Sequence, residues 1–211
     1  MQKCRGVDVG WGCSYRELEK FGESLRTEGL PGVGKLAPMD RIDALTLFDE
    51  MDAEPVSARR GARYPLVRRV VPDEAFPEEI GGATNFVSGK FVVSISNRTY
   101  QGLSVGEARA RWTVVHEFGH TRLHPDVLVT RATLPHISQA ALRRGDADHK
   151  IYRDSEWQCD SLTAALLMPL SALLDLRESG TLDEAVLVRQ FGVSYEAAAY
   201  RIDNLRRGAL T

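Results

Sequence analysis

The feature that most constrains this chain is the pentapeptide His116-Glu117-Phe118-Gly119-His120, an H-E-x-x-H motif. Side chains four residues apart lie on one face of an α-helix, so both imidazoles can reach a single metal ion. Glu117 then lies beside that ion without having to bind it. Two histidine ligands with a glutamate general base are the pattern of zinc peptidases. The motif therefore predicts a helix that binds Zn²⁺ and carries Glu117 as catalytic base.

The flanking sequence predicts the limits of this helix. Ser104 and Glu107 have the spacing of a capping box, which favours a helix start directly after Ser104. Apolar residues then recur at helical spacing and form one buried stripe. Pro125 disfavours helical geometry at His124. We therefore expect a helix over residues 105–123, with the motif in its last turns.

A catalytic zinc site usually has three protein ligands, and two positions compete for the third. Metzincins place it six residues after the second histidine, where this chain has Asp126, but the glycine of that pattern is replaced by Leu123. Glu156 is the stronger candidate because a second capping box, over residues 155–158, starts an apolar helix there. Asp160 lies four residues further on, so one acid can bind the metal while the other accepts the free ring N–H of a ligating histidine.

Longer segments around these residues follow a known pattern: 111–120, 152–160 and 166–169. They resemble the R-x-T-x-x-H-E-x-G-H, E-x-Q-A-[ND] and L-L-M-P motifs of the ImmA/IrrE family of zinc metallopeptidases. The resemblance extends from about Gly89 to Pro169. It departs from the family where Cys159 replaces the usual alanine and Leu162-Thr163 replace Phe-Ala. None of these positions is a candidate ligand.

The resemblance implies roles for five residues. His116, His120 and Glu156 would bind zinc, Glu117 would act as base, and Asp160 would support a ligating ring. It also implies a substrate class, helix-turn-helix transcriptional repressors that are cut to switch on stress or mobile-element genes. Two other interpretations stay open, because function depends on the site and its specificity surface. One is a peptidase that acts on a toxin–antitoxin partner, and the other is a DNA-binding regulator with a structural zinc site.

Composition narrows the class of protein further. The 211 residues carry a net charge of −2, so bulk charge does not imply binding to nucleic acid or to an anionic membrane. The first thirty residues lack the apolar core of a secretory signal, and no run approaches the roughly 18 apolar residues of a transmembrane helix. Cys4, Cys13 and Cys159 show no metal-type spacing and predict reduced thiols in a cytoplasmic protein. We expect Cys159 to be a small buried residue, with a redox or inhibitory thiol near the zinc as the alternative.

The order of the expected elements indicates an α+β fold, with a small sheet packed on the motif helix and a mostly helical C-terminal part. We expect a metallopeptidase domain over residues 1–170 and a helix-turn-helix-like tail over 171–211. The expected elements are helices 14–26, 41–51 and 137–144, a strand 64–71, and a hairpin of strands 84–87 and 90–96. The last strand either is an edge strand that pairs with an extended substrate or is a plain core strand.

Two groups of residues remain without an assigned role. The first comprises His124, His136, His149 and Tyr152, which either donate a hydrogen bond to the oxyanion or lie on the surface. The second is the tail, in which a capping box at Thr181–Glu184 and a turn at 191–194 predict two helices. From residue 181 onward four arginines balance four acids, whereas DNA recognition calls for a basic face. The balanced charge of the tail therefore indicates a role in packing or substrate docking, and direct nucleic-acid binding is not expected.

Overall fold

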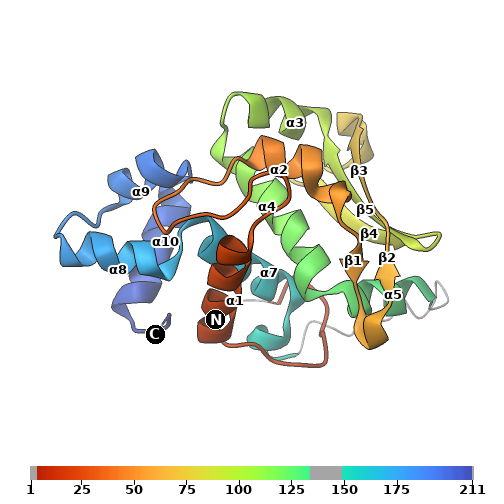
Figure 1. Cartoon of the computed structure of the whole chain (residues 1–211), viewed down its shortest axis with the longest axis horizontal. Helices are drawn as coiled ribbons and strands as arrows, with labels where there is room; N and C mark the ends of the chain where they lie inside the picture. The colour runs from red at the N-terminus through yellow and green to blue at the C-terminus, as the bar shows by residue number, and fades with distance from the viewer. Residues whose placement is uncertain (1–3, 134–148, 211) are drawn as a thin grey trace.

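The computed structural model of the chain describes residues 4–133 and 149–210 (Figure 1). Its secondary structure is α+β, which confirms the predicted class. The predicted helix 137–144 and His136 lie outside the described residues. Among the described residues no single helix has the length and apolar character of a membrane span. Helices α7 (Ser155–Leu167) and α8 (Leu170–Glu178) meet that test only when taken together, across a 51° bend.

The larger sheet has three strands in the order β3-β5-β4. Strands β4 (Gly82–Val87) and β5 (Lys90–Ser96) form the predicted hairpin, with Ser88 and Gly89 at φ values of 50° and 78° in its turn. Positive φ at both turn residues matches the twist of a two-residue hairpin. Strand β3 (Leu66–Val71) pairs with β5 in parallel. A second, two-stranded sheet joins β1 (Val56–Ser57) to β2 (Arg63–Tyr64).

This strand order decides between the two alternatives for strand 90–96, which is a plain core strand and not an edge. Strand β5 lies in the centre of the sheet, where Phe91, Val93 and Ile95 are fully buried. Among the described strands, the edge strand beside the motif helix is β4. Parallel pairing of β3 with β5 depends on a crossover connection, which local sequence patterns do not reveal.

The region before the motif helix also differs from the prediction. Helix α3 (Asn97–Ser104) follows β5 directly and is capped by Ser96, whose hydroxyl accepts from the Thr99 N–H. Helix α4 (Ala108–Leu123) begins only after Gly106, which has a φ of +74°. Ser104 therefore ends one helix and does not cap the next, so the predicted capping box is wrong. The predicted end of α4 at Leu123 is confirmed.

Helix α4 lies between the sheet and the helical part of the molecule (Figure 1). Its buried side chains include Val114, Val115 and Phe118. On the side away from the sheet it packs against α7 (Ser155–Leu167), which in turn packs against α1 (Tyr15–Glu28). The other helices in the described segments are α2 (Ala44–Glu50), α5 (Pro125–Thr133), α8 (Leu170–Glu178), α9 (Glu184–Phe191) and α10 (Tyr195–Arg206), with 3₁₀ turns at Met51–Ala53, Arg59–Gly61, Asp73–Ala75 and Ile151–Arg153.

The residues that cap the helix starts agree with the predicted caps at some helices and differ from them at others. The capping box of Ser14 with Glu17 is present at the start of α1, as the predicted helix 14–26 requires. The carboxylate of Asp43 caps α2, so that helix begins three residues later than expected. At α7 and α9 the caps are Asp154 and Asp183. In each of these three cases an aspartate takes the capping role that a different residue was expected to have.

The C-terminal helices are fixed to the rest of the molecule by a buried ion pair. Arg201 of α10 donates to both carboxylate oxygens of Glu19 of α1, and both side chains are 3% exposed. The same guanidinium donates to the Met168 carbonyl at the end of α7, at 3.0 and 2.7 Å. Removing one partner of such a pair leaves an uncompensated buried charge. The proposed boundary near residue 170 stays a prediction, and helices on its two sides share this contact.

Candidate metal centre

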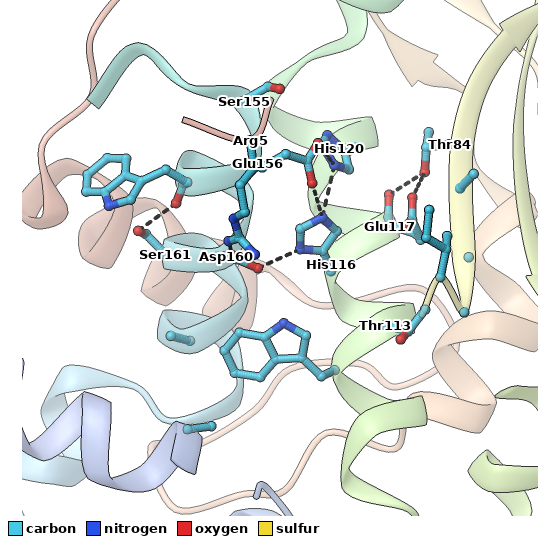
Figure 2. Close-up of a pocket in the computed structure, with 18 of the residues that line it drawn as sticks. Arg5, Thr84, Thr113, His116, Glu117, His120, Ser155, Glu156, Asp160 and Ser161 are labelled. Atoms are coloured by element: carbon cyan, nitrogen blue, oxygen red, sulfur yellow. Dashed lines mark hydrogen bonds and ion pairs between the residues drawn. The ribbon is translucent and has the colours of Figure 1, made fainter. Parts of the chain in front are cut away.

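Helices α4 and α7 bring the predicted metal donors together. His116 and His120 lie one turn apart on α4, and Glu156 projects toward them from the first turn of α7 (Figure 2). The two Nε2 atoms are 3.1 Å apart, and the Glu156 oxygens lie 3.2 Å from His116 Nε2 and 3.4 Å from His120 Nε2. Tetrahedral zinc with bonds of about 2.0–2.1 Å to nitrogen separates neighbouring donors by about 3.3 Å. The spacing of these three groups therefore fits a zinc ion.

The electrostatics of the cluster also favour a cation at its centre. Burial opposes the charged form of His116, yet hydrogen bonds to Asp160 and Glu156 raise its pKa to about 10. Burial likewise opposes ionisation of Glu156, but hydrogen bonds from His116 and His120 hold its pKa well below the usual value. A positive charge among these donors is thus strongly stabilised. Zinc would supply that charge while leaving both rings neutral.

The far nitrogen of His116 is held by a charged pair. Its Nδ1 lies 3.1 Å from Asp160 Oδ1, and the other oxygen of Asp160 is paired with Arg5 from the N-terminal segment (Figure 2). A carboxylate can only accept here, so Nδ1 carries a hydrogen, and in the neutral ring that zinc would bind Nε2 keeps its lone pair. Such carboxylate–histidine pairs orient metal-binding rings. The structure therefore places Asp160 where the sequence predicts it.

The far nitrogen of His120 is held differently, by His124. The two Nδ1 atoms are 3.1 Å apart, and His124 is only 1% exposed. His124 does not lie on the surface, and both of its ring nitrogens bond to other side chains, those of His120 and Gln158, so neither nitrogen is free to serve an oxyanion. Helical spacing gave a signal for this position, since the residue follows His120 by four. Its place before Pro125 suggested a helix end instead.

Cys159 is the other candidate donor near the two rings. Its thiol lies within 4.8 Å of their nitrogens. However, it donates to the backbone carbonyl of His116 at 2.9 Å, and complete burial raises its pKa well above the usual value. A thiol ligand must be deprotonated, so Glu156 suits the metal better. The predicted role of Cys159 as a small buried residue is confirmed, and no disulfide joins the three cysteines of the described segments.

Glu117 faces away from α7, toward the sheet (Figure 2). Its Oε2 accepts a 2.6 Å hydrogen bond from the Thr84 hydroxyl on β4, and the residue is 7% exposed. Strand β4 lies very close to α4 at this point, since a Cβ on Gly82 would be 3.1 Å from Glu117 Cγ. Thr84 was not found by sequence analysis, because only the sheet brings it to the motif helix.

These side chains line one cavity of about 1190 Å³. The lining includes the four predicted donors and supports, His116, His120, Glu156 and Asp160, together with Glu117. It continues along β4 on one side and reaches α10 on the other. A cavity of this size with a metal cluster, a buried carboxylate and an exposed strand edge is suited to an extended peptide.

Two further candidates lie elsewhere. Asp126 is on α5, where its carboxylate accepts from the Arg59 N–H at 2.7 Å and pairs with the Arg59 guanidinium. It does not line the cavity, so the structure does not bring it to the rings. His149 is bonded through Nε2 to Asp154 at 3.1 Å, and Tyr152 is 40% exposed. Neither lines the cavity, so neither is placed to serve an oxyanion there.

Comparison with known families agrees with this geometry. Residues 104–203 match the family described as the IrrE N-terminal-like domain, which is a family of peptidases. The match includes the motif helix, α7 and most of the C-terminal helices. The resemblance to the ImmA/IrrE family is thereby confirmed. No curated protein matches the chain.

Proposed function

We propose that the protein is a zinc-dependent endopeptidase, because residues 104–203 match the IrrE N-terminal-like family of peptidases. The observation that carries the proposal is the convergence of His116, His120 and Glu156 within 3.1–3.4 Å of one another. Glu117 lines the same cavity, one residue from the first of these donors. Two histidines, one glutamate and a separate carboxylate form the residue set of a His₂Glu zinc hydrolase.

The chemistry follows from these positions. When bound by His116, His120 and Glu156, zinc would act as a Lewis acid, which would lower the pKa of a water molecule to about 7 and polarise the scissile carbonyl. Glu117 accepts the proton of the attacking water and returns it to the leaving amine. Thr84 donates to Glu117 Oε2 and so fixes the carboxylate, leaving Oε1 to handle the proton. His116 and His120 act only as ligands and are held by their far nitrogens.

The edge of β4 supports recognition of an unfolded or extended segment. Within the described residues this strand pairs only with β5, so its other edge presents backbone N–H and C=O groups. Residues 82–84 of this strand, and Gly81 just before it, line the same cavity as Glu117. An extended peptide can add to such an edge by backbone hydrogen bonds that do not depend on its sequence. Strand β4 therefore takes the substrate-pairing role that sequence analysis considered for strand 90–96.

A helix-turn-helix repressor remains our proposed substrate, by analogy with the ImmA/IrrE family. A cytoplasmic location belongs to the same proposal. The C-terminal helices do not support the interpretation as a DNA-binding regulator. Their charges balance, and Arg201 is buried in an ion pair with Glu19. A toxin–antitoxin partner is the alternative substrate, and cleavage assays with both kinds of protein distinguish them.

The central test is Glu117→Gln. This substitution keeps the shape of the side chain and removes its basicity, so we expect zinc content to stay the same and cleavage to fall by about 10²- to 10⁴-fold. The measurement is cleavage of a candidate repressor, of an antitoxin and of casein, each with and without a chelator.

Three results would contradict parts of the proposal. Retained cleavage by the Glu117→Gln variant would remove Glu117 from the mechanism. Cleavage that survives chelation would remove the metal. Cleavage of casein without cleavage of any repressor would leave the peptidase but remove the regulatory substrate.

A further inference from the structure

The position of His124 depends on a buried amide with a fixed orientation. The side-chain nitrogen of Gln158 donates to two backbone carbonyls, those of Tyr152 at 2.9 Å and Trp11 at 3.2 Å. A carbonyl only accepts, so this end of the amide must be the NH₂ group. The amide oxygen is then the atom that lies 3.0 Å from His124 Nε2. Gln158 is fully buried, and both of its ends are satisfied.

The fixed amide determines where the protons lie on two histidines. The Gln158 oxygen can only accept, so His124 carries a hydrogen on Nε2. His124 is only 1% exposed, and among the described residues its ring nitrogens bond to Gln158 and His120 and to no carboxylate, so the ring is neutral and its Nδ1 is an acceptor. The Nδ1 of His120, 3.1 Å away, must then carry a hydrogen. Its Nε2 keeps the lone pair that faces Glu156.

We propose that His124 and Gln158 are positioning residues that hold His120 in the Nδ1–H tautomer and so direct its Nε2 lone pair at the metal. This inference rests on the proposed zinc site. Neither residue touches the metal or the substrate, and both act through His120. Partners of this kind typically change metal affinity by about 10- to 100-fold when they are removed.

The chain of hydrogen bonds ends on a segment far from the motif in sequence. Trp11 precedes α1 and lies outside residues 104–203, the region that matches the peptidase family. Its segment is held by backbone bonds from Val9 N–H to the Arg153 carbonyl at 3.0 Å and from Cys13 N–H to the Tyr152 carbonyl at 3.1 Å. The N-terminal segment is thus part of the metal centre, although it supplies no ligand.

The first experiment compares Gln158→Met with Thr163→Val. Methionine fills a similar volume but cannot accept from His124, so His124 loses its fixed tautomer and His120 loses its acceptor. Thr163 is a matched control, because it is fully buried on the same helix and bonds only to the Cys159 carbonyl, at 2.8 Å. We expect Gln158→Met to weaken zinc binding by about 10- to 100-fold and Thr163→Val to leave it unchanged. Competition with a chromophoric chelator measures zinc affinity, and thermal unfolding of the same samples checks folding.

The second experiment reads the tautomers directly and needs no variant. Long-range ¹H–¹⁵N NMR spectra of the zinc-loaded wild type should show hydrogen on Nε2 of His124 and on Nδ1 of His120. The opposite tautomer of His124 would overturn the inference. Equal zinc affinity of Gln158→Met and Thr163→Val would also overturn it. Failure of the wild type to bind zinc would instead overturn the proposed function, and the inference with it.

Discussion

The two histidines of the motif lie one turn apart on the same helix, yet their supports differ in chemistry. Behind His116 stands a charged pair near the solvent, in which Asp160 is 30% and Arg5 is 63% exposed. Behind His120 stands a neutral chain of His124 and Gln158 that is almost completely buried. Both arrangements place a hydrogen on the far nitrogen of the ring. They reach this result by charge on one side and by fixed geometry on the other.

The difference bears on how strongly the metal can activate water. Each carboxylate added near zinc lowers its net positive charge and weakens it as a Lewis acid. Arg5 offsets the charge of Asp160, and the neutral chain behind His120 adds none. Both rings are therefore held in orientation, and Glu156 is the carboxylate that directly contacts their donor nitrogens. A second carboxylate behind His120 would orient that ring equally well, at the cost of Lewis acidity.

The largest effect is expected from Asp160→Ala. The substitution removes the acceptor of the His116 Nδ1 hydrogen and leaves Arg5 without its partner beside the cation site. We expect zinc affinity to fall by about 100-fold, at the upper end of the range for such partners. Asp160→Asn keeps an acceptor but removes the charge, so its loss should be about tenfold. Chelator competition measures both constants.

The two variants together test the distinction between charge and geometry. Equal losses for Asp160→Ala and Asp160→Asn would show that charge alone matters on this side. Wild-type affinity in Asp160→Asn would show that the two sides work in the same way, which would break the comparison.

The residues on the two faces of α4 and α7 were predictable because helices repeat every 3.6 residues. A spacing of four residues predicted that His116 and His120 share one helix face and that Glu156 and Asp160 share another. The family resemblance then predicted that the two pairs form one site. Arg5 and Thr84 were not predictable in this way, because long-range packing of the N-terminal segment and of β4 brings them to the site. Gln158 is part of the E-x-Q-A-[ND] family motif, but the orientation of its amide depends on the carbonyl of Trp11, 147 residues away.

The fold shows the same division between local and long-range information. The hairpin and the C-terminal ends of α4 and α7 follow from turn residues and prolines close in sequence. The order β3-β5-β4 follows from pairing between strands that are separated by a crossover, so local patterns left open whether strand 90–96 is an edge or a core strand. The break between α3 and α4 was missed because Ser104 fits a helix cap and Gly106 alone does not reveal a turn.

A smaller effect is expected from Arg5→Ala, and it should depend on salt. Exposed ion pairs contribute about 0.2–1 kcal/mol and are screened by ions. We therefore expect zinc affinity to change by at most about fivefold at low ionic strength and to match the wild type at about 1 M salt. Arg5→Lys should restore most of the low-salt value. Salt should leave the effect of Gln158→Met unchanged, since that chain is neutral and buried.

A salt-independent loss in Arg5→Ala would contradict this account. It would mean that the N-terminal segment acts on the centre through its backbone position and not through the charge of Arg5. Gly6 offers a way to separate these causes, because a Cβ there would lie 2.6 Å from the Glu156 nitrogen. Gly6→Ala should displace the segment while keeping the charge of Arg5.

The smallest effect is expected from Cys159→Ala, because Cys159 lies between the two supports and belongs to neither. Its thiol bonds to the His116 carbonyl and packs where a Cβ on Gly119 would be only 2.8 Å from Sγ. We expect unchanged zinc affinity and a loss of about 1 kcal/mol in unfolding free energy, as for one buried methyl-sized group. Gly119→Ala should be strongly destabilising alone and better tolerated together with Cys159→Ala. A zinc affinity reduced more than tenfold in Cys159→Ala would instead make the thiol a ligand, and the neutral and charged supports would then need to be assigned again.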